Sequence, residues 1–236
     1  MKRKLYFHGL KTGLPVGLGY FSVSFGFGAL AAAQGVRTLD ATLISMTNLT
    51  SAGQFAGLML IVAGTTVGEM ILTMLVINSR YALMSLALSQ RMGERIGILP
   101  RLLIAFFNTD EIFTLAMAER EALTVPFLLG LGGLPILGWT GGTLLGALAG
   151  SVLPASVRTA LGVMLYGMFI AIVVPPARKE RPVLMAALLA LVLSCLFTWV
   201  PGLRDISGGI SIVICTVAAA AVCAWLFPVA EEEVAG

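Results

Sequence analysis

The residues Asn48-Leu49-Thr50-Ser51-Ala52-Gly53-Gln54 interrupt an apolar segment that is long enough to cross a membrane. A second polar group, Asn108-Thr109-Asp110-Glu111, interrupts another apolar segment. In each, a helix-starting residue is followed three positions later by Gln or Glu, at Ser51–Gln54 and at Asn108–Glu111, which is typical of a capping box. The two patterns predict helices that begin inside the membrane, where unpaired N–H groups and the positive end of the helix dipole need a partner.

The composition indicates that lipid is the solvent of this chain. Of its 236 residues, 58% are hydrophobic and 11% are charged, whereas about a quarter of the residues of a soluble domain are charged. Apolar runs of about 20 residues, the length that spans a bilayer, recur along the sequence. The 27 glycines suit close contacts between helices in lipid. We therefore predict an all-α, polytopic integral membrane protein.

Six segments are predicted to cross the membrane completely, and two are predicted to be interrupted or re-entrant. The complete spans are approximately 13–35, 66–90, 126–150, 155–176, 182–199 and 206–228, and the interrupted segments are 41–63 and 98–120. The N-terminal region imitates a signal peptide, but its apolar run from Leu14 to Ala33 is long enough to span, so we expect it to remain as the first helix.

The basic residues indicate how the two interrupted segments enter the membrane. If both segments cross, eight Lys and Arg residues lie inside and six outside; if both enter and leave on one side, the loop 91–101 moves inside, which gives eleven against three. The second arrangement follows the positive-inside rule far better and predicts re-entrant segments. Both arrangements place the N- and C-termini in the cytoplasm.

The connections between the predicted spans are short, and no linker separates them. We expect one membrane domain over 1–236. The charged loop Arg178–Pro182 divides it into a site-forming half, 1–176, and a C-terminal helical hairpin, 182–228.

The tripeptide Gly-Leu-Pro occurs at 13–15 and again at 133–135. In a chain so rich in Gly and Leu, chance explains this coincidence better than an internal repeat does.

The sequence contains no set of residues that suits a metal, a cofactor or a hydrolytic centre. The single histidine, His8, lies in the basic N-terminal region, and Cys195, Cys215 and Cys223 lie in apolar runs without a Cys-x-x-Cys pair. Metal sites need convergent ligands, and a nucleophilic serine needs a nearby base. We therefore expect no metal, no cofactor, no enzymatic activity and no nucleic-acid partner.

Charged residues inside the apolar runs mark the candidate site. Glu69 and Arg80 are eleven residues apart in one predicted helix, so they share a face but lie roughly 16 Å apart along its axis, too far for an ion pair. Arg80, which lies next to Asn78, either extends to the headgroups or turns inward to meet Asp110 or Glu111. A charge at the bilayer centre costs at least about 2.5 kcal/mol on insertion scales.

Two interpretations apply to the polar residues at each predicted helix start. Asp110 and Glu111 either complement the helix dipole, which is worth roughly 1 kcal/mol, or also bind an ammonium group or carry a proton. Gln54 either closes its capping box or lies beside a buried helix N-terminus whose N–H groups need an acceptor. A substrate carboxylate could be that acceptor. In transporters, paired interrupted segments of this kind point to the substrate site.

An ordered set of motifs resembles the AzlC family of membrane permeases, the large subunits of branched-chain amino acid exporters. These motifs are Pro15-Val16-Gly17-Leu18-Gly19-Tyr20, Phe25-Gly26-Phe27-Gly28, Ser51-Ala52-Gly53-Gln54-Phe55, Asn78-Ser79-Arg80-Tyr81, Thr109-Asp110-Glu111, Trp139 with Gly142, Thr143 and Gly146, and Gly209-Ile210-Ser211-Ile212. They follow the family's order along nearly the whole chain. The chain departs from the pattern at Tyr81, where the family commonly has His, and matches it loosely over 161–169.

The resemblance implies a permease of the bacterial inner membrane that exports valine, leucine or isoleucine together with a small hydrophobic, AzlD-like subunit. The residues predicted to bind the substrate are Ser51, Gln54, Asn78, Arg80, Asp110 and Glu111. The carboxylate would lie at the helix start near Ser51–Gln54, and the ammonium group would face Asp110 or Glu111.

Burial favours the protonated form of a carboxylic acid. Asp110, Glu111 and Glu69 are therefore candidates for coupling transport to protons. The alternative function is that of a structural or regulatory membrane subunit whose partner carries the substrate site.

Overall fold

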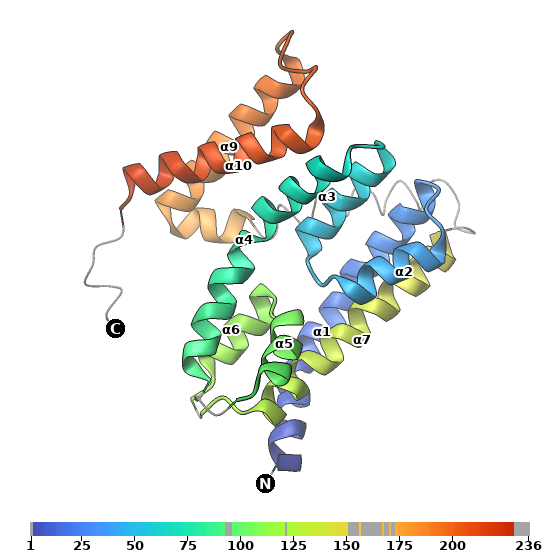
Figure 1. Cartoon of the computed structure of the whole chain (residues 1–236), viewed down its shortest axis with the longest axis vertical. Helices are drawn as coiled ribbons and strands as arrows, with labels where there is room; N and C mark the ends of the chain where they lie inside the picture. The colour runs from blue at the N-terminus through green and yellow to red at the C-terminus, as the bar shows by residue number, and fades with distance from the viewer. Residues whose placement is uncertain are drawn as a thin grey trace. The chain divides into compact units, whose positions relative to one another are not determined.

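The computed structural model describes residues 2–92, 96–120, 122–150 and 173–228, together with residues 156, 167 and 170. The described residues form helices joined by short turns, as Figure 1 shows. In chain order the helices are α1 (Lys2–Ala33), α2 (Thr38–Thr47), α3 (Ser51–Val62), α4 (Val67–Arg91), α5 (Ile98–Phe106), α6 (Asp110–Ala118), α7 (Val125–Gly150), α9 (Arg181–Trp199) and α10 (Gly208–Leu226). The predicted all-α polytopic fold is confirmed.

Five of the described helices are long and apolar enough to cross a membrane, namely α1, α4, α7, α9 and α10. They match five of the six predicted complete spans. The sixth, 155–176, lies mostly outside the described residues. The predicted start of the first span was wrong, because α1 begins at Lys2 rather than near residue 13 and includes His8. Charged residues do not end a helix, and Gly9 packs this early part of α1 closely against α7.

Both predicted interruptions are confirmed. The segment 41–63 is broken between α2 and α3, at Asn48–Thr50, and the segment 98–120 is broken between α5 and α6, at Phe107–Thr109. Each therefore consists of two short helices rather than one spanning helix.

The chain folds as two compact units. Unit 1 consists of Met1–Leu58 and Asn78–Leu165, and unit 2 consists of Met59–Ile77 and Tyr166–Gly236. Unit 1 contains α1, α2, α5, α6 and α7 with parts of α3 and α4, and unit 2 contains α9 and α10 with the remaining parts. The single domain predicted over 1–236 stays a prediction.

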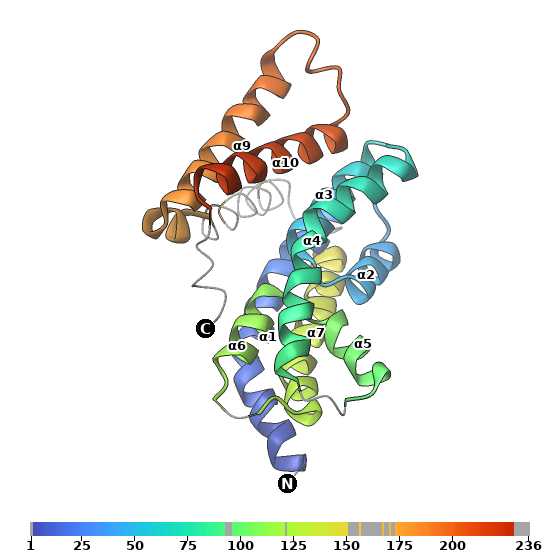
Figure 2. The same ribbon diagram turned by 60° about the vertical axis from the view of Figure 1, so that its left-hand side comes forward.

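The centre of unit 1 is the contact between α1 and α7, which lie side by side (Figures 1 and 2). Glycines allow their backbones to meet. A Cβ atom added at Gly13 of α1 would lie 2.2 Å from the Leu131 carbonyl oxygen, and one added at Gly146 of α7 would lie 2.0 Å from that of Phe25. In lipid, close backbone packing of this kind replaces the hydrophobic effect as the source of helix association.

The two helices are parallel, because contacts advance together along both, from Gly9 beside Phe127 to Gly28 beside Thr143. Gly13 and Gly17 contact Leu131 and Leu134, so the two Gly-Leu-Pro motifs lie at one level of the pair, which favours an internal repeat. Pro135 cannot donate a hydrogen bond to the carbonyl of Leu131, and that freed carbonyl is the one that faces Gly13.

The segment 98–120 forms a helical hairpin at one end of unit 1. Along α5 and into the break, Arg101 donates to Ser89 at 2.8 Å and Asn108 donates to Ser85 at 3.1 Å. The two partners on α4 are one helical turn apart, so α5 runs antiparallel to α4, from the C-terminal end of α4 towards its middle.

The return path follows α6. Its first residue, Asp110, pairs with Arg80 of α4 at 2.6 Å. At its other end, the carbonyls of Met117 and Glu119 accept hydrogen bonds from Arg91, at the C-terminus of α4. The chain therefore leaves the hairpin beside the end of α4 from which it entered, and its entry and exit on one side of the membrane stay a prediction. Glu119 also lies 3.0 Å from His8, which places this end beside the N-terminal part of α1.

The segment 41–63 forms a second hairpin, from the opposite end of the α1–α7 pair. It follows the C-terminal end of α1 directly, and Ser45 near the end of α2 lies 2.6 Å from Thr143 of α7. After the break, Gln54 of α3 bonds both to Ser45 and to Trp139. Because α3 begins against the last turn of α2, the chain turns back at this break.

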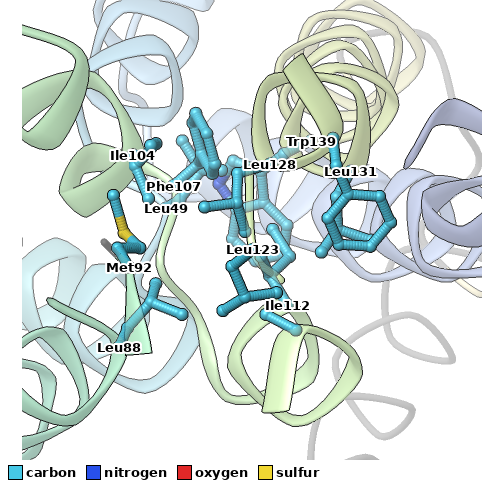
Figure 3. Packing of buried hydrophobic residues seen from close by; sticks show 12 residues of the cluster. Leu49, Leu88, Met92, Ile104, Phe107, Ile112, Leu123, Leu128, Leu131 and Trp139 are labelled. Carbon is cyan, nitrogen blue, oxygen red and sulfur yellow. The ribbon is translucent and has the colours of Figure 1, made fainter. Parts of the chain in front are cut away.

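The two breaks meet in one buried cluster. Leu49 from the first break and Phe107 from the second are each 4% exposed and belong to the same apolar core as Trp139 of α7. Figure 3 shows the side chains of this core gathered between the surrounding helices. Two helices, α3 and α6, therefore begin in the interior of unit 1.

In unit 2, α9 and α10 pack against each other. The first turn of α4 joins them through Glu69, whose Oε1 accepts a hydrogen bond from the backbone N–H of Gly209 at 2.9 Å. None of the described residues of α9 is buried, as expected of a helix that faces lipid or a partner.

Candidate functional site

A helix begins at the first predicted capping box, Ser51–Gln54, as expected. The predicted hydrogen bonds of that box were wrong. Ser51 is the first helical residue, so Thr50 occupies the capping position. Asn48 accepts from the backbone N–H of Thr50 at 3.1 Å. The Gln54 amide points away from the helix start: its nitrogen donates to Ser45, and its oxygen accepts from Trp139 Nε1 at 2.9 Å. Tertiary partners have displaced the local cap.

The second predicted box, Asn108–Glu111, was displaced by one residue. Thr109 precedes the first helical residue and makes no side-chain cap. Asn108 donates to Ser85, and its carbonyl oxygen Oδ1 is buried without a partner among the described residues. Glu111 does not turn back to the helix start. It bonds to Tyr20 of α1 instead.

Tyr20 links α1 to the second break, a role that sequence reasoning missed. Its hydroxyl lies 2.5 Å from Glu111 Oε2 and 2.5 Å from Thr109 Oγ1. A carboxylate only accepts and a phenol has one proton, so Tyr20 donates to Glu111 and accepts from Thr109. Its ring also packs edge-on against Trp139 at 5.3 Å. The only sequence signal for this role was its place in a resemblance motif.

The ion pair between Arg80 and Asp110 is the predicted meeting of the arginine with a carboxylate. Their closest atoms are 2.6 Å apart, and the two side chains are 45% and 44% exposed. The arginine also lies over the Tyr81 ring, 4.9 Å from its centroid. The alternative, in which Arg80 extends to the headgroups, stays a prediction. Because both side chains are about half exposed, a ligand can reach either partner of this pair.

Asn78 and Ser51 lie at the start of α3. A Cβ atom added at Gly53 would lie 2.8 Å from Asn78 Oδ1 and 2.7 Å from Thr50 Oγ1, so only glycine lets the Asn78 amide approach this first turn. Asn78 Oδ1 is buried without a partner among the described residues. Ser51, Gln54 and Asn78 therefore surround one helix N-terminus, whereas Arg80, Asp110 and Glu111 surround the other. The remaining candidate, Glu69, lies in unit 2.

A buried chain of hydrogen bonds fixes the first hairpin against α7. It runs from Trp139 through Gln54 and Ser45 to Thr143, and each of these residues is at most 1% exposed. Every link is satisfied, and a satisfied polar network in an apolar interior specifies one arrangement. Gln54 is thus a residue that positions the start of α3.

An open groove of about 390 Å³ lies between α1 and α6. Its lining residues are Thr12, Pro15, Val16, Asp110, Glu111, Thr114 and Leu115. The hydroxyl protons of Thr12 and Thr114 are already donated to carbonyls one turn back, at 3.0 and 2.7 Å. These hydroxyls and the two carboxylates can therefore only accept hydrogen bonds from a ligand.

Comparison with known proteins identifies the family. Residues 15–153, more than half of the chain, match the family model described as "AzlC protein". The chain belongs to the AzlC family. The part that matches the AzlC family model contains both hairpins and all six residues predicted to bind substrate.

Two relatives agree with membership of the AzlC family. "Inner membrane protein YgaZ" of Escherichia coli (strain K12) is 28% identical over 192 residues, which cover 78% of each chain. An "Uncharacterized membrane protein" of Archaeoglobus fulgidus is 31% identical over 176 residues, 74% of this chain and 77% of the relative. No solved structure matches. Membership of this family, with five described helices long and apolar enough to cross a membrane, indicates a multi-pass membrane protein.

Proposed function

We propose that this AzlC protein is a secondary transporter that exports branched-chain amino acids across the cytoplasmic membrane, together with a small hydrophobic AzlD-like subunit. The observation that carries the proposal is the meeting of two helical hairpins in unit 1, each of which turns where a helix begins. Interrupted helices whose N-termini face one interior region are the arrangement by which transporters hold anionic groups of their substrates.

The substrate carboxylate would lie between the first turn of α3 and Arg80. Ser51 and the backbone N–H groups of that turn are donors, and α4 carries both Asn78, which contacts the turn, and Arg80. Arg80 would exchange Asp110 for the substrate, because a half-exposed ion pair is worth little by itself. Gln54 would act indirectly, by fixing α3.

The substrate ammonium group would lie in the groove between α1 and α6. Three N–H donors of an ammonium group match a lining that offers acceptors only, namely Asp110, Glu111 and the two threonine hydroxyls. Pro15 adds another acceptor, because it leaves the Lys11 carbonyl without its helical partner. Val16 and Leu115 supply apolar surface for a branched side chain.

Counterflow in proteoliposomes tests the proposal. Vesicles that contain this chain and its small neighbour subunit are loaded with unlabelled valine, and uptake of labelled valine is followed. We expect uptake by the unaltered protein, and Asp110→Asn and Glu111→Gln to lower its rate at least about tenfold, the scale of a lost charge-assisted contact. Normal membrane insertion of each variant is checked beside the rate.

Asp40→Asn is the matched control. Asp40 also lies in the first turn of a short helix, but it pairs at 2.7 Å with the exposed Arg37. The hydrogen bond from Arg37 lowers the pKa of the Asp40 carboxyl, and neither residue lines the groove. Unchanged counterflow in both Asp110→Asn and Glu111→Gln would contradict the proposed site. If valine exchanges in these vesicles but no amino acid shifts the melting temperature of the purified chain alone, the partner carries the site and this chain is its structural subunit.

A further inference from the structure

Unit 2 contains a polar cluster that the substrate site does not use. Glu69 lies in the first turn of α4, and its Oε1 accepts a hydrogen bond from the N–H of Gly209, the second residue of α10, at 2.9 Å. Thr73, one turn further along α4, is fully buried, and its Oγ1 has no partner among the described residues. A buried polar group without a partner is costly, so the presence of this hydroxyl needs an explanation.

Both side chains are directed at the same point on α10. A Cβ atom added at Gly209 would lie 2.5 Å from Glu69 Oε1 and 2.8 Å from Thr73 Oγ1. Glycine at this position is what allows the carboxylate and the hydroxyl to reach the helix start. Ser207, which precedes α10, makes no side-chain cap, and its Oγ is also buried without a partner in the part of the chain that the structure describes.

This arrangement suits a carboxyl group in either protonation state. An ionised Glu69 is stabilised by the Gly209 N–H and by the positive end of the α10 dipole. The Thr73 hydroxyl, which has no partner among the described residues, approaches the same point on α10, and a change of side-chain rotamer would bring it within reach of the carboxylate. When Glu69 is protonated, its new O–H needs an acceptor, and the same hydroxyl oxygen offers one. A metal cation fits poorly, because an N–H group and a positive helix end face the carboxylate.

The other titratable groups of this region leave Glu69 as its ionisable centre. Besides Glu69, the described residues of unit 2 carry Arg181 and Cys195 on α9, Cys215 and Cys223 on α10, Arg204 and Asp205 in the turn between these helices, and Arg178, Lys179 and Glu180 before α9. Arg204 and Asp205 pair with each other at 3.9 Å and are well exposed. None of these groups is joined to Glu69 by a hydrogen bond or ion pair among the described residues.

We propose that Glu69 is a proton-binding site that couples transport to the proton gradient, with Thr73 and the start of α10 as the groups that hold it in both states. This inference rests on the transport function proposed above. A proton taken up from one side converts the carboxylate to a neutral acid and weakens its attraction to α10, and release of that proton to the other side restores it. The strength of the contact between α4 and α10 therefore depends on whether Glu69 carries a proton.

Two measurements on one preparation separate coupling from transport. Valine counterflow at equal pH needs no net proton movement, whereas uphill valine accumulation in response to an imposed pH gradient does. In the Glu69→Gln variant, the amide oxygen can still accept from Gly209, but the side chain cannot bind a proton. We expect counterflow within about twofold of the unaltered protein and gradient-driven accumulation reduced at least about tenfold, the scale of a lost proton-transfer group.

Thr73→Val provides the second test, because it keeps the shape and removes the hydroxyl. We expect it to shift the pH dependence of gradient-driven transport while counterflow persists. Ser211→Ala is the matched control: it removes a hydroxyl one turn further along α10 that bonds only to the Ser207 carbonyl, at 3.0 Å, and its pH dependence should be unchanged.

Each outcome decides between the two proposals. If the unaltered protein exchanges valine but a pH gradient drives nothing, the coupling proposal is overturned and the transport proposal stands. If no amino acid exchanges, the transport proposal fails first. Gradient-driven accumulation by Glu69→Gln at the unaltered rate would overturn the role of Glu69. Should that variant not insert, a pH profile of Thr73→Val identical to that of the unaltered protein would do the same.

Discussion

The two hairpins of unit 1 share a design but differ in how their breaks are held. The break between α2 and α3 is fixed by hydrogen bonds that are entirely buried, through Gln54, Ser45 and their partners on α7. The break between α5 and α6 is held by charged groups that are about half exposed, above all Arg80 and Asp110. The first hairpin therefore provides a rigid helix start, and the second provides groups that a ligand can recruit.

The largest effect is expected in a test of membrane topology, which asks from which side of the membrane each hairpin enters. In a chain whose three cysteines are replaced by alanine, single cysteines at Gly97 and Arg120 flank the second hairpin, and a cysteine at Leu39 marks the start of the first. A membrane-impermeant thiol reagent should label the first two from the same side and the third only from the other. Labelling of positions 97 and 120 from opposite sides would show that this segment crosses the bilayer.

The largest change in stability should follow loss of the buried network. Gln54→Leu leaves the Trp139 N–H without an acceptor in an apolar interior, and we expect it to cost about 2–3 kcal/mol, seen as a lower melting temperature of the purified protein. The control Gln34→Leu makes the same exchange at an exposed turn and should change little. Equal stability of the two variants would mean that the first hairpin is not held as described.

The second hairpin should show the reverse pattern. Arg80→Gln removes a half-exposed ion pair, which is worth at most about 1 kcal/mol, so the melting temperature should hardly move. Valine counterflow should fall by about tenfold or more, because the charge-assisted contact to the substrate carboxylate is lost. A large loss of stability together with unchanged exchange would assign Arg80 a structural role and remove the contrast between the hairpins.

The smallest effect is expected at Tyr20. Tyr20→Phe keeps the edge-on contact with Trp139 and removes the hydroxyl that joins Thr109 to Glu111. The cost should be about 1 kcal/mol. Because Glu111 gains freedom, we expect the change to appear in the substrate concentration at half-maximal exchange rather than in the maximal rate. A change in the maximal rate alone would place Tyr20 outside substrate binding.

The sequence predicted where the hairpins break, because polar helix-starting residues inside apolar runs are a local signal. It also gave the pairing of Arg80 with a carboxylate as one of two alternatives, since an intramembrane arginine is costly without a partner. It did not predict the partners of Gln54 and Glu111. Those partners, Trp139 and Tyr20, are 85 and 91 residues distant along the chain, and contacts at that range outweighed the local capping pattern.

The extent of α1 was missed for a related reason. The prediction followed the apolar run, whereas α1 begins at Lys2 and its early part, around Gly9, also packs against α7. Gly9 shows this, because its missing side chain admits the Phe127 carbonyl to within 2.1 Å of the Cβ position. Packing between distant segments, rather than hydropathy, set this boundary.

The glycine contact between α1 and α7 also limits how the protein can move. A seam that leaves no room for a single methyl group over several turns resists sliding and rolling, because either displacement would drive carbonyl oxygens into the facing backbone. During a transport cycle these two helices should therefore stay fixed relative to each other and act as one rigid body. Because buried hydrogen bonds also fix the first hairpin to α7, the moving parts are then α5 and α6 of the second hairpin. Opening to either face of the membrane therefore requires a shift of these short helices rather than a rearrangement of the whole bundle.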